Sequence, residues 1–188
     1  MKNTKIFAFY FCSFFLIVGC GHDIQKQYYE TGELKEEIKK LYNDSLYTIL
    51  YSKTGKILEK GKIYNKLKEG YWQEFYTDGV IKWEGKYKKG KREYNTLNLN
   101  DADCELIIKG NPSFLKVGQT YPLRIKVNGM HPEDIMLGSN NGIMKIYSDK
   151  YEYDYTMTPS KVDSLNLKIF IATPGEMTTL CNIIFIVE

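Results

Sequence analysis

The chain has 188 residues, with 26 Lys and Arg against 23 Asp and Glu, and a formal net charge of +3 at pH 7. So small a net charge excludes a general attraction to polyanions, and a chain of this length forms one large or two small domains. Ile, Tyr, Phe, Thr and Val outweigh Ala in the composition, which favours strands and an all-β fold.

The first twenty residues have the order of a secretory signal peptide. Lys2 and Lys5 precede an apolar run from Ile6 to Val18, and Gly19 stands just before Cys20. The run is shorter than the roughly 20 apolar residues that cross a bilayer. A transmembrane anchor and a plain secreted protein cut near Gly19 are therefore the less favoured alternatives. Cys12 lies in the run and would be removed with it.

A cysteine directly after the cut resembles the lipobox of bacterial lipoproteins. The resemblance implies that residues 1–19 are removed and that Cys20 carries a diacylglyceryl group and an acylated amino terminus. Several acyl chains on one residue exceed the two signals that stable anchoring needs. Residues 20–26 would then tether the protein to a membrane of the cell envelope, and we expect the outer membrane.

One pattern recurs between residues 27 and 94. Tyr28–Leu34, Tyr51–Ile57 and Phe75–Ile81 each place an aromatic residue before a Thr-Gly or Asp-Gly dipeptide. Glycine there accepts the positive φ of a tight turn, which predicts hairpins that stack into one elongated antiparallel sheet.

The residues after the third turn alternate, as in a strand buried on one side. Ile81, Trp83 and Tyr87 are predicted on one face, and Lys82, Glu84 and Lys86 on the other. Gly85 is expected to leave room for a ring from a neighbouring hairpin.

The third of these units resembles the MORN repeat in its MORN-2 variant. The matching residues are Gly70, Trp72, Phe75, Tyr76, Gly79, Ile81, Gly85, Tyr87 and Gly90. The second unit has Ser45-Leu46-Tyr47 in place of the leading Gly-x-Trp, and the first keeps only its turn. The resemblance implies a repeat sheet over residues 27–94. Many bacterial chains with this repeat are labelled antitoxins, a cytoplasmic role that conflicts with the export signal.

Three features of this region leave alternatives open. Residues 33–42 have apolar residues at helical spacing, although the register of the units favours a strand. Residues 53–92 hold 12 basic against 5 acidic residues, which suits either anionic lipid headgroups or a solvated sheet face. Five aromatic residues are either exposed for sugar rings or lipid, or form the core of a single-layer sheet. They are Tyr71, Trp72, Tyr76, Trp83 and Tyr87.

The second half predicts a β-sandwich. Residues 95–103 are polar and non-periodic and are expected to be a linker. Residues 104–188 contain about seven short alternating runs between turn signals and no helical pattern, and Tyr121–Val127 and Tyr151–Met157 are two of these runs. The region resembles the Ig-like C-terminal domain of the gliding-motility protein GldM, which implies an Ig-like fold. The matching residues are Val117, Gly118, Tyr121–Ile125, Gly129, Pro132, Asn141, Gly142 and Tyr155.

Cys104 and Cys181 fall on the apolar side of the first and last predicted strands. In an oxidising envelope two such cysteines form a disulfide, and the alternative is a pair of small buried thiols.

No sequence motif points to catalysis. The sequence has no G-x-S-x-G, no phosphate-binding glycine loop, no C-x-x-C and no H-E-x-x-H. His131 is expected in a solvated turn, and Glu74 and Glu84 are expected as surface charges, the alternative being a carboxylate pair for sugar hydrolysis. We therefore expect no enzyme activity, no metal and no cofactor.

The expected function is that of a lipid-anchored envelope protein. It would bind or scaffold another envelope protein, and its second partner is the membrane through Cys20. The alternative is a carbohydrate or cell-wall contact through the aromatic face. The basic, aromatic run Trp83–Arg92 would suit a phosphate backbone, but export removes nucleic acid as a partner.

Overall fold

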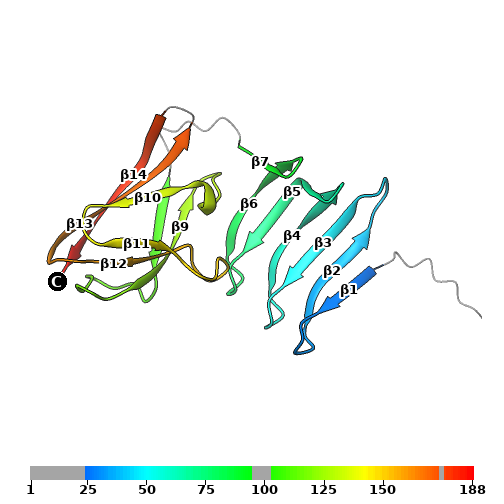
Figure 1. Ribbon diagram of the computed structural model, residues 1–188, viewed down its shortest axis with the longest axis horizontal. Helices are drawn as coiled ribbons and strands as arrows, with labels where there is room; N and C mark the ends of the chain where they lie inside the picture. Colours follow the sequence, from blue (N-terminus) through cyan, green and yellow to red (C-terminus); the bar gives the residue numbers. More distant parts are fainter. Residues whose placement is uncertain (1–23, 95–102, 174–175) are drawn as a thin grey trace, which may run out of the picture.

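The computed structural model describes residues 24–94, 103–173 and 176–188. Its regular elements in these ranges are β-strands and one short 3-10 helix, η2 (Pro132–Asp134). Figure 1 shows a single-layer sheet and, beside its last strands, a second part built from two further sheets. The prediction of an all-β chain is confirmed. The lipid-attachment candidate Cys20 lies outside the described residues, as does most of the predicted linker.

The first part is one antiparallel sheet of seven strands in sequence order. The strands are β1 (Ile24–Tyr28), β2 (Leu34–Lys40), β3 (Leu46–Tyr51), β4 (Ile57–Tyr64), β5 (Leu67–Phe75), β6 (Ile81–Lys88) and β7 (Lys91–Glu93). The strand interpretation of residues 33–42 is confirmed by β2. Gly55 and Gly79 have φ of +79° and +90°, as the predicted tight turns require.

We call the two faces of this sheet inner and outer. Residues paired across neighbouring strands share a face, so the pairs Glu74–Trp83 and Gly70–Tyr87 place these four residues on the inner face. Trp72, opposite Gly85, joins them. The outer face carries the intervening residues, which include Tyr71, Gln73, Glu84 and Lys86.

A β-bulge after the third turn corrects the predicted alternation in β6. Phe75 pairs with Ile81 and Glu74 pairs with Trp83, which leaves Lys82 as an extra residue. A bulge re-aims side chains, and Lys82 is buried beside Trp83 whereas Ile81 is exposed. The prediction that Lys82 shares a solvated face with Glu84 is therefore wrong.

The same irregularity occurs in the preceding hairpin. Leu50 pairs with Glu59 and Tyr51 pairs with Ile57, so Leu58 is the extra residue there, and it is buried as well. The bulge position is thus apolar in the second hairpin and cationic in the third.

The second part, which we call the two-sheet module, packs two sheets around one core. One sheet has the order β11-β12-β9-β8 and the other β10-β13-β14. The strands are β8 (Cys104–Ile108), β9 (Tyr121–Val127), β10 (Met136–Ser139), β11 (Ile143–Ile146), β12 (Tyr155–Thr158), β13 (Asp163–Thr173) and β14 (Glu176–Val187). Leu123 and Met157 of the first sheet and Leu165 and Leu167 of the second are fully buried in this core.

Two local features of the module bear on the predictions. The run Tyr151–Met157 is a strand only from Tyr155, because Asp149 organises a turn and accepts hydrogen bonds from the backbone N–H groups of Tyr151 and Glu152. Cys104 in β8 and Cys181 in β14 form a disulfide, one of the two outcomes left open by the sequence. The disulfide therefore joins the two sheets.

Candidate functional site at the junction of the two parts

Four of the five singled-out aromatic residues are buried. Trp72, Tyr76, Trp83 and Tyr87 are 1%, 4%, 4% and 6% exposed, and Tyr71, on the outer face, is 53% exposed. The interpretation of these residues as an exposed, ligand-facing surface is wrong for all but Tyr71. A single-layer sheet has few other apolar side chains to bury, so they form its core.

Trp72, Tyr87 and Trp83 pack against one another on the inner face. The ring of Tyr87 meets those of Trp72 and Trp83 edge-on, with centroids 5.9 Å and 5.5 Å away. The Trp72 ring covers Gly61 of the neighbouring strand, and its Nε1 donates to the carbonyl oxygen of Lys62 at 3.0 Å. Gly85 is instead covered by Trp83 of its own strand. The prediction that Gly85 makes room for a ring from a neighbouring hairpin is therefore wrong, and a ring of that kind lies instead over Gly61.

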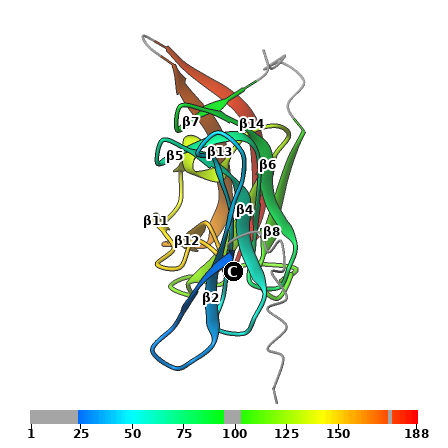
Figure 2. The same ribbon diagram turned by 90° about the vertical axis from the view of Figure 1, so that its right-hand side faces the viewer.

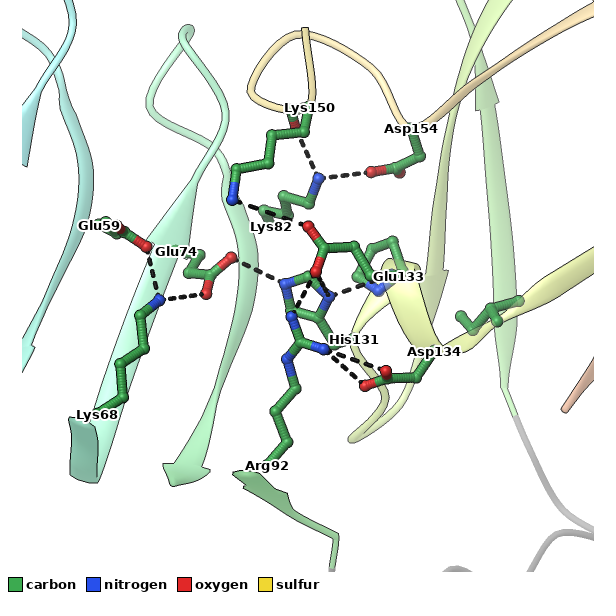
Figure 3. Close-up of polar contacts among 12 residues, drawn as sticks. Glu59, Lys68, Glu74, Lys82, Arg92, His131, Glu133, Asp134, Lys150 and Asp154 are labelled. Carbon is green, nitrogen blue, oxygen red and sulfur yellow. Dashed lines mark hydrogen bonds and ion pairs between the residues drawn. The ribbon is translucent and has the colours of Figure 1, made fainter. Parts of the chain in front are cut away.

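The two-sheet module docks at the β6–β7 end of the seven-stranded sheet. Figure 1 shows β1 at the opposite end of the sheet from the module, and Figure 2 looks along the row of strands from the side on which the first strands lie. The contacts come from η2 and its N-cap, from the loop between β11 and β12, and from β9. Figure 3 shows the polar side chains that meet there. The candidate functional site is this junction, because it gathers most of the buried charged groups of the described chain.

His131 and Glu74 form the centre of the junction. His131 is fully buried, so its predicted place in a solvated turn is wrong. Its Nε2 lies 2.8 Å from Glu74 Oε2, and its Nδ1 accepts a hydrogen bond from the Glu133 backbone N–H at 3.1 Å. A neutral ring with its proton on Nε2 satisfies both contacts. Burial lowers the pKa of His131, which favours this neutral form.

Glu74 is held as a carboxylate by its other neighbours. Lys68 Nζ lies 3.1 Å from Glu74 Oε1 and 2.7 Å from Glu59 Oε2, and the Tyr87 hydroxyl donates to Glu74 Oε1 at 3.3 Å. Burial alone would raise the pKa of Glu74, but the hydrogen bond to His131 and the charge of Lys68 outweigh it and hold the pKa far below its usual range. Glu74 is thus neither the expected surface charge nor a free catalytic acid.

A second buried pair joins Lys82 to Asp154. Their charged groups lie 2.8 Å apart, and both side chains are 2% exposed. Asp154 Oδ2 also accepts hydrogen bonds from the Tyr76 hydroxyl at 2.7 Å and from the Ile125 backbone N–H at 2.9 Å. Burial, followed by the charge of Asp154, raises the pKa of Tyr76, so its hydroxyl remains a donor.

Two arginines complete the junction from opposite sides. Arg92 of β7 binds Glu133 at 2.6 Å and Asp134 at 2.9 Å, both in η2. Arg124 of β9 binds Asp78 in the third turn of the sheet at 2.6 Å. Its guanidinium also lies 3.9 Å from the centre of the Tyr76 ring. Each arginine therefore links a residue of the sheet to a residue of the module.

The side chains of the junction form buried ion pairs and hydrogen bonds that hold the module against the sheet. Glu74 and Glu84 do not converge, because Glu84 lies on the outer face and accepts hydrogen bonds from Tyr71 and Gln73. The alternative of a carboxylate pair for sugar hydrolysis is therefore wrong for these two residues. Removing one partner of a buried ion pair costs about 3–5 kcal/mol, so these contacts fix how the module sits on the sheet.

Across residues 24–94, 103–173 and 176–188 there is no group of three or more His, Cys, Asp or Glu side chains that could hold a metal ion. Those ranges also contain no helix that is long and apolar enough to cross a membrane. Comparisons with protein families, with curated proteins and with solved structures found no match.

Sequence reasoning missed most of the junction, although one signal was present. Glu74 and Lys82 occupy the positions that Leu50 and Leu58 hold one repeat unit earlier, 24 residues before. The first unit, however, has Gln27 and Lys35 at these positions, and Lys35 is exposed, so a polar residue there does not by itself indicate a contact with the second half of the chain. The second half of the chain has no repeat units, so no equivalent positions exist with which His131, Arg124 and Asp154 could be compared.

Proposed function

We propose that this chain is a lipid-anchored protein of the cell envelope that binds or scaffolds another envelope protein and catalyses no reaction. Residues 1–19 would be a cleaved signal peptide, and the membrane would hold the protein through Cys20. In this proposal the seven-stranded sheet is a MORN-2-type repeat sheet and the two-sheet module is an Ig-like sandwich.

The observation that supports binding is the open outer face of the sheet. The module packs at one end and against inner-face residues, while Lys60, Tyr71, Gln73 and Glu84 lie on the outer face. Seven strands spaced about 4.8 Å apart span roughly 29 Å, and six residues along a strand add about 20 Å. The product is about 580 Å² of flat projection, about three-quarters of the roughly 800 Å² that each partner buries in a standard protein interface.

The composition of the outer face fits a protein partner. Tyr71 is exposed, and its hydroxyl donates to Glu84, so the ring is held in place beside charged groups. Tyrosine is enriched in protein interfaces, whose rims are polar. A carbohydrate contact through Trp72, Tyr76, Trp83 and Tyr87 has no such support, because these rings are covered.

The binding proposal is tested by photo-crosslinking in intact cells. A photoreactive amino acid at Tyr71 or Lys60 is expected to give a discrete adduct with another envelope protein. The matched control is the same amino acid at Lys168, an exposed residue of β13 on the two-sheet module. Equal labelling at all three positions, or none at the two sheet positions, would contradict a docking role for the outer face.

The anchor is tested separately. Cys20→Ser is expected to leave an unprocessed precursor that takes up no labelled fatty acid, because that thiol is the only proposed attachment point. Cys12→Ser should be processed and labelled like the natural chain. Fatty-acid labelling that persists in Cys20→Ser would refute lipid attachment at this residue.

A further inference from the structure

The two-sheet module covers the aromatic inner face of the β5–β6 hairpin. The His131 ring packs edge-on against Trp83, with centroids 5.4 Å apart. The Arg124 guanidinium lies over the Tyr76 ring, and Asp154 accepts the hydrogen bond from its hydroxyl. Movement of the module away from the sheet would therefore expose aromatic side chains that are now buried.

The hydrogen bonds that His131 makes with Glu74 and with the Glu133 backbone require a neutral imidazole ring. His131 Nδ1 is an acceptor for the Glu133 backbone N–H, and Nε2 faces Glu74. Protonation places a second N–H on the ring, which turns Nδ1 into a donor that points at another donor. The hydrogen bond that caps the start of η2 is then lost, and a second charge is buried.

We propose that the His131–Glu74 contact is an acid-released latch, which holds the two-sheet module over the aromatic inner face and weakens when His131 is protonated. This inference goes beyond the proposed function, because it needs neither the lipid nor a partner. In the docked state the latch keeps that face from other molecules, and acidification shifts the docking equilibrium toward the state in which the face is uncovered.

Charged groups on several elements affect the pKa of His131. Glu74 of β5 and Glu133 of η2 favour the protonated ring, whereas Arg92 of β7 opposes it, and Trp83 of β6 packs on the ring without a charge. Lys68 neutralises part of the Glu74 charge at 3.1 Å. Burial is the largest influence and keeps the pKa of the docked ring below its ordinary value of 6.5.

The direction of the pH dependence follows from this. A released His131 regains its ordinary pKa, so the docked state binds fewer protons than the released state. Docking is at full strength above about pH 6.5 and weakens as the pH falls below it, by up to about tenfold in the docking equilibrium per pH unit. Glu74, with an ordinary pKa of 4.5, adds to the loss only at lower pH.

The test uses the mature chain, residues 20–188, with Cys20→Ser and its disulfide intact. Trp72 and Trp83 are the only tryptophans of the sequence, so the emission spectrum reports on the inner face. Between pH 8 and pH 5 we expect a red shift in emission and a larger radius of gyration in solution scattering. Far-UV circular dichroism should keep its strand signal.

Two substitutions make the test specific. His131→Gln keeps a donor for Glu74 and an acceptor for the Glu133 N–H but does not titrate, so its transition should vanish between pH 8 and pH 5. His22→Gln removes the only other histidine of the chain and should behave like the parent. If His131→Gln does not fold, the ring titration of His131 followed by NMR in the parent must coincide with the transition.

Three results would overturn the latch. They are an unchanged spectrum and radius down to pH 5, an identical transition in His131→Gln, and tighter docking at pH 5. The last would mean that protonated His131 is stabilised by Glu74 more than it is penalised by burial. None of these results bears on fatty-acid labelling or on crosslinks from the outer face, so the proposed function is judged independently.

Discussion

Lys82 shows how one residue determines what a hairpin contacts. It stands at the bulge where the preceding hairpin has Leu58, and the bulge turns it toward the inner face. Its ammonium group then meets Asp154 and the carbonyl oxygen of Lys150, both in the two-sheet module. A leucine at this position would have left Asp154 with two hydrogen bonds but no counter-charge. The cation therefore makes this hairpin fit the module.

We predict that Lys82→Met lowers the free energy of unfolding by about 3–5 kcal/mol, because it leaves Asp154 buried without its cation. Urea denaturation measures the change. The double variant Lys82→Met with Asp154→Asn should recover part of the loss, since the amide oxygen still accepts from Tyr76 and Ile125. Lys88→Met, which removes a long and exposed ion pair with Glu93, is the control and should change little. Equal losses in the single and double variants would contradict a charge effect.

At the scale of the element, each hairpin depends on how closely its neighbour approaches. Gly61 in β4 lies opposite Trp72 in β5, and the indole ring occupies the space where a side chain would stand. That contact explains the glycine at position 61, and it also positions the Trp72 Nε1 for its bond to the Lys62 carbonyl oxygen.

Gly61→Ala is expected to destabilise the sheet by about 1–3 kcal/mol, because the new methyl group overlaps the Trp72 ring and forces it to move. Thermal unfolding followed by tryptophan emission measures this, since Trp72 reports directly. Gly138→Ala in β10 meets the edge of the Phe170 ring, so a smaller effect is expected there. A Gly61→Ala protein as stable as the parent would show that the sheet tolerates a wider spacing.

How far the sequence predicts these elements depends on which interactions form them. The hairpins follow from the turn glycines and the alternation of residues, both of which are local, and β2 and the three turns agree with the prediction. The burial of Lys82 and Ile81's exposure do not follow, because a bulge shifts the side-chain alternation by one residue. The loop before β12 was predicted as a strand because its tyrosines alternate, yet it forms a turn and contacts the sheet.

At the scale of the whole molecule, the two parts are held in different ways. The seven-stranded sheet has a cluster of aromatic side chains as its core, and the two-sheet module has a conventional apolar core and a disulfide. The junction between them is mostly ionic. The sequence could not reveal it, because Glu74 and His131 are 57 residues apart and each alone is typical of a surface position.

The disulfide closes a long loop, which predicts a large effect of reduction on the module alone. Its cysteines are 77 residues apart, and the chain-entropy relation gives about 4.5 kcal/mol for such a loop. We expect Cys104→Ser with Cys181→Ser to lower the unfolding midpoint of the module while the Trp72 and Trp83 emission transition shifts less. Mass spectrometry without reductant should recover a peptide pair joined through these cysteines. Free thiols at both positions in the protein isolated without reductant would contradict the bond.

At the bulges that hold Leu58 and Lys82, the pairing of the strands does not depend on which side chain the extra residue has. In both hairpins the backbone pairing resumes after the extra residue in the same pattern, whether that residue is a leucine or a lysine. A lysine at the bulge does not by itself end the sheet, because Lys35 is the extra residue of the first hairpin and further strands follow it. Lys82 differs in that Asp154 of the module faces it. We expect that a chain lengthened by one copy of residues 57–80 would still seat its last hairpin against the module in the same way.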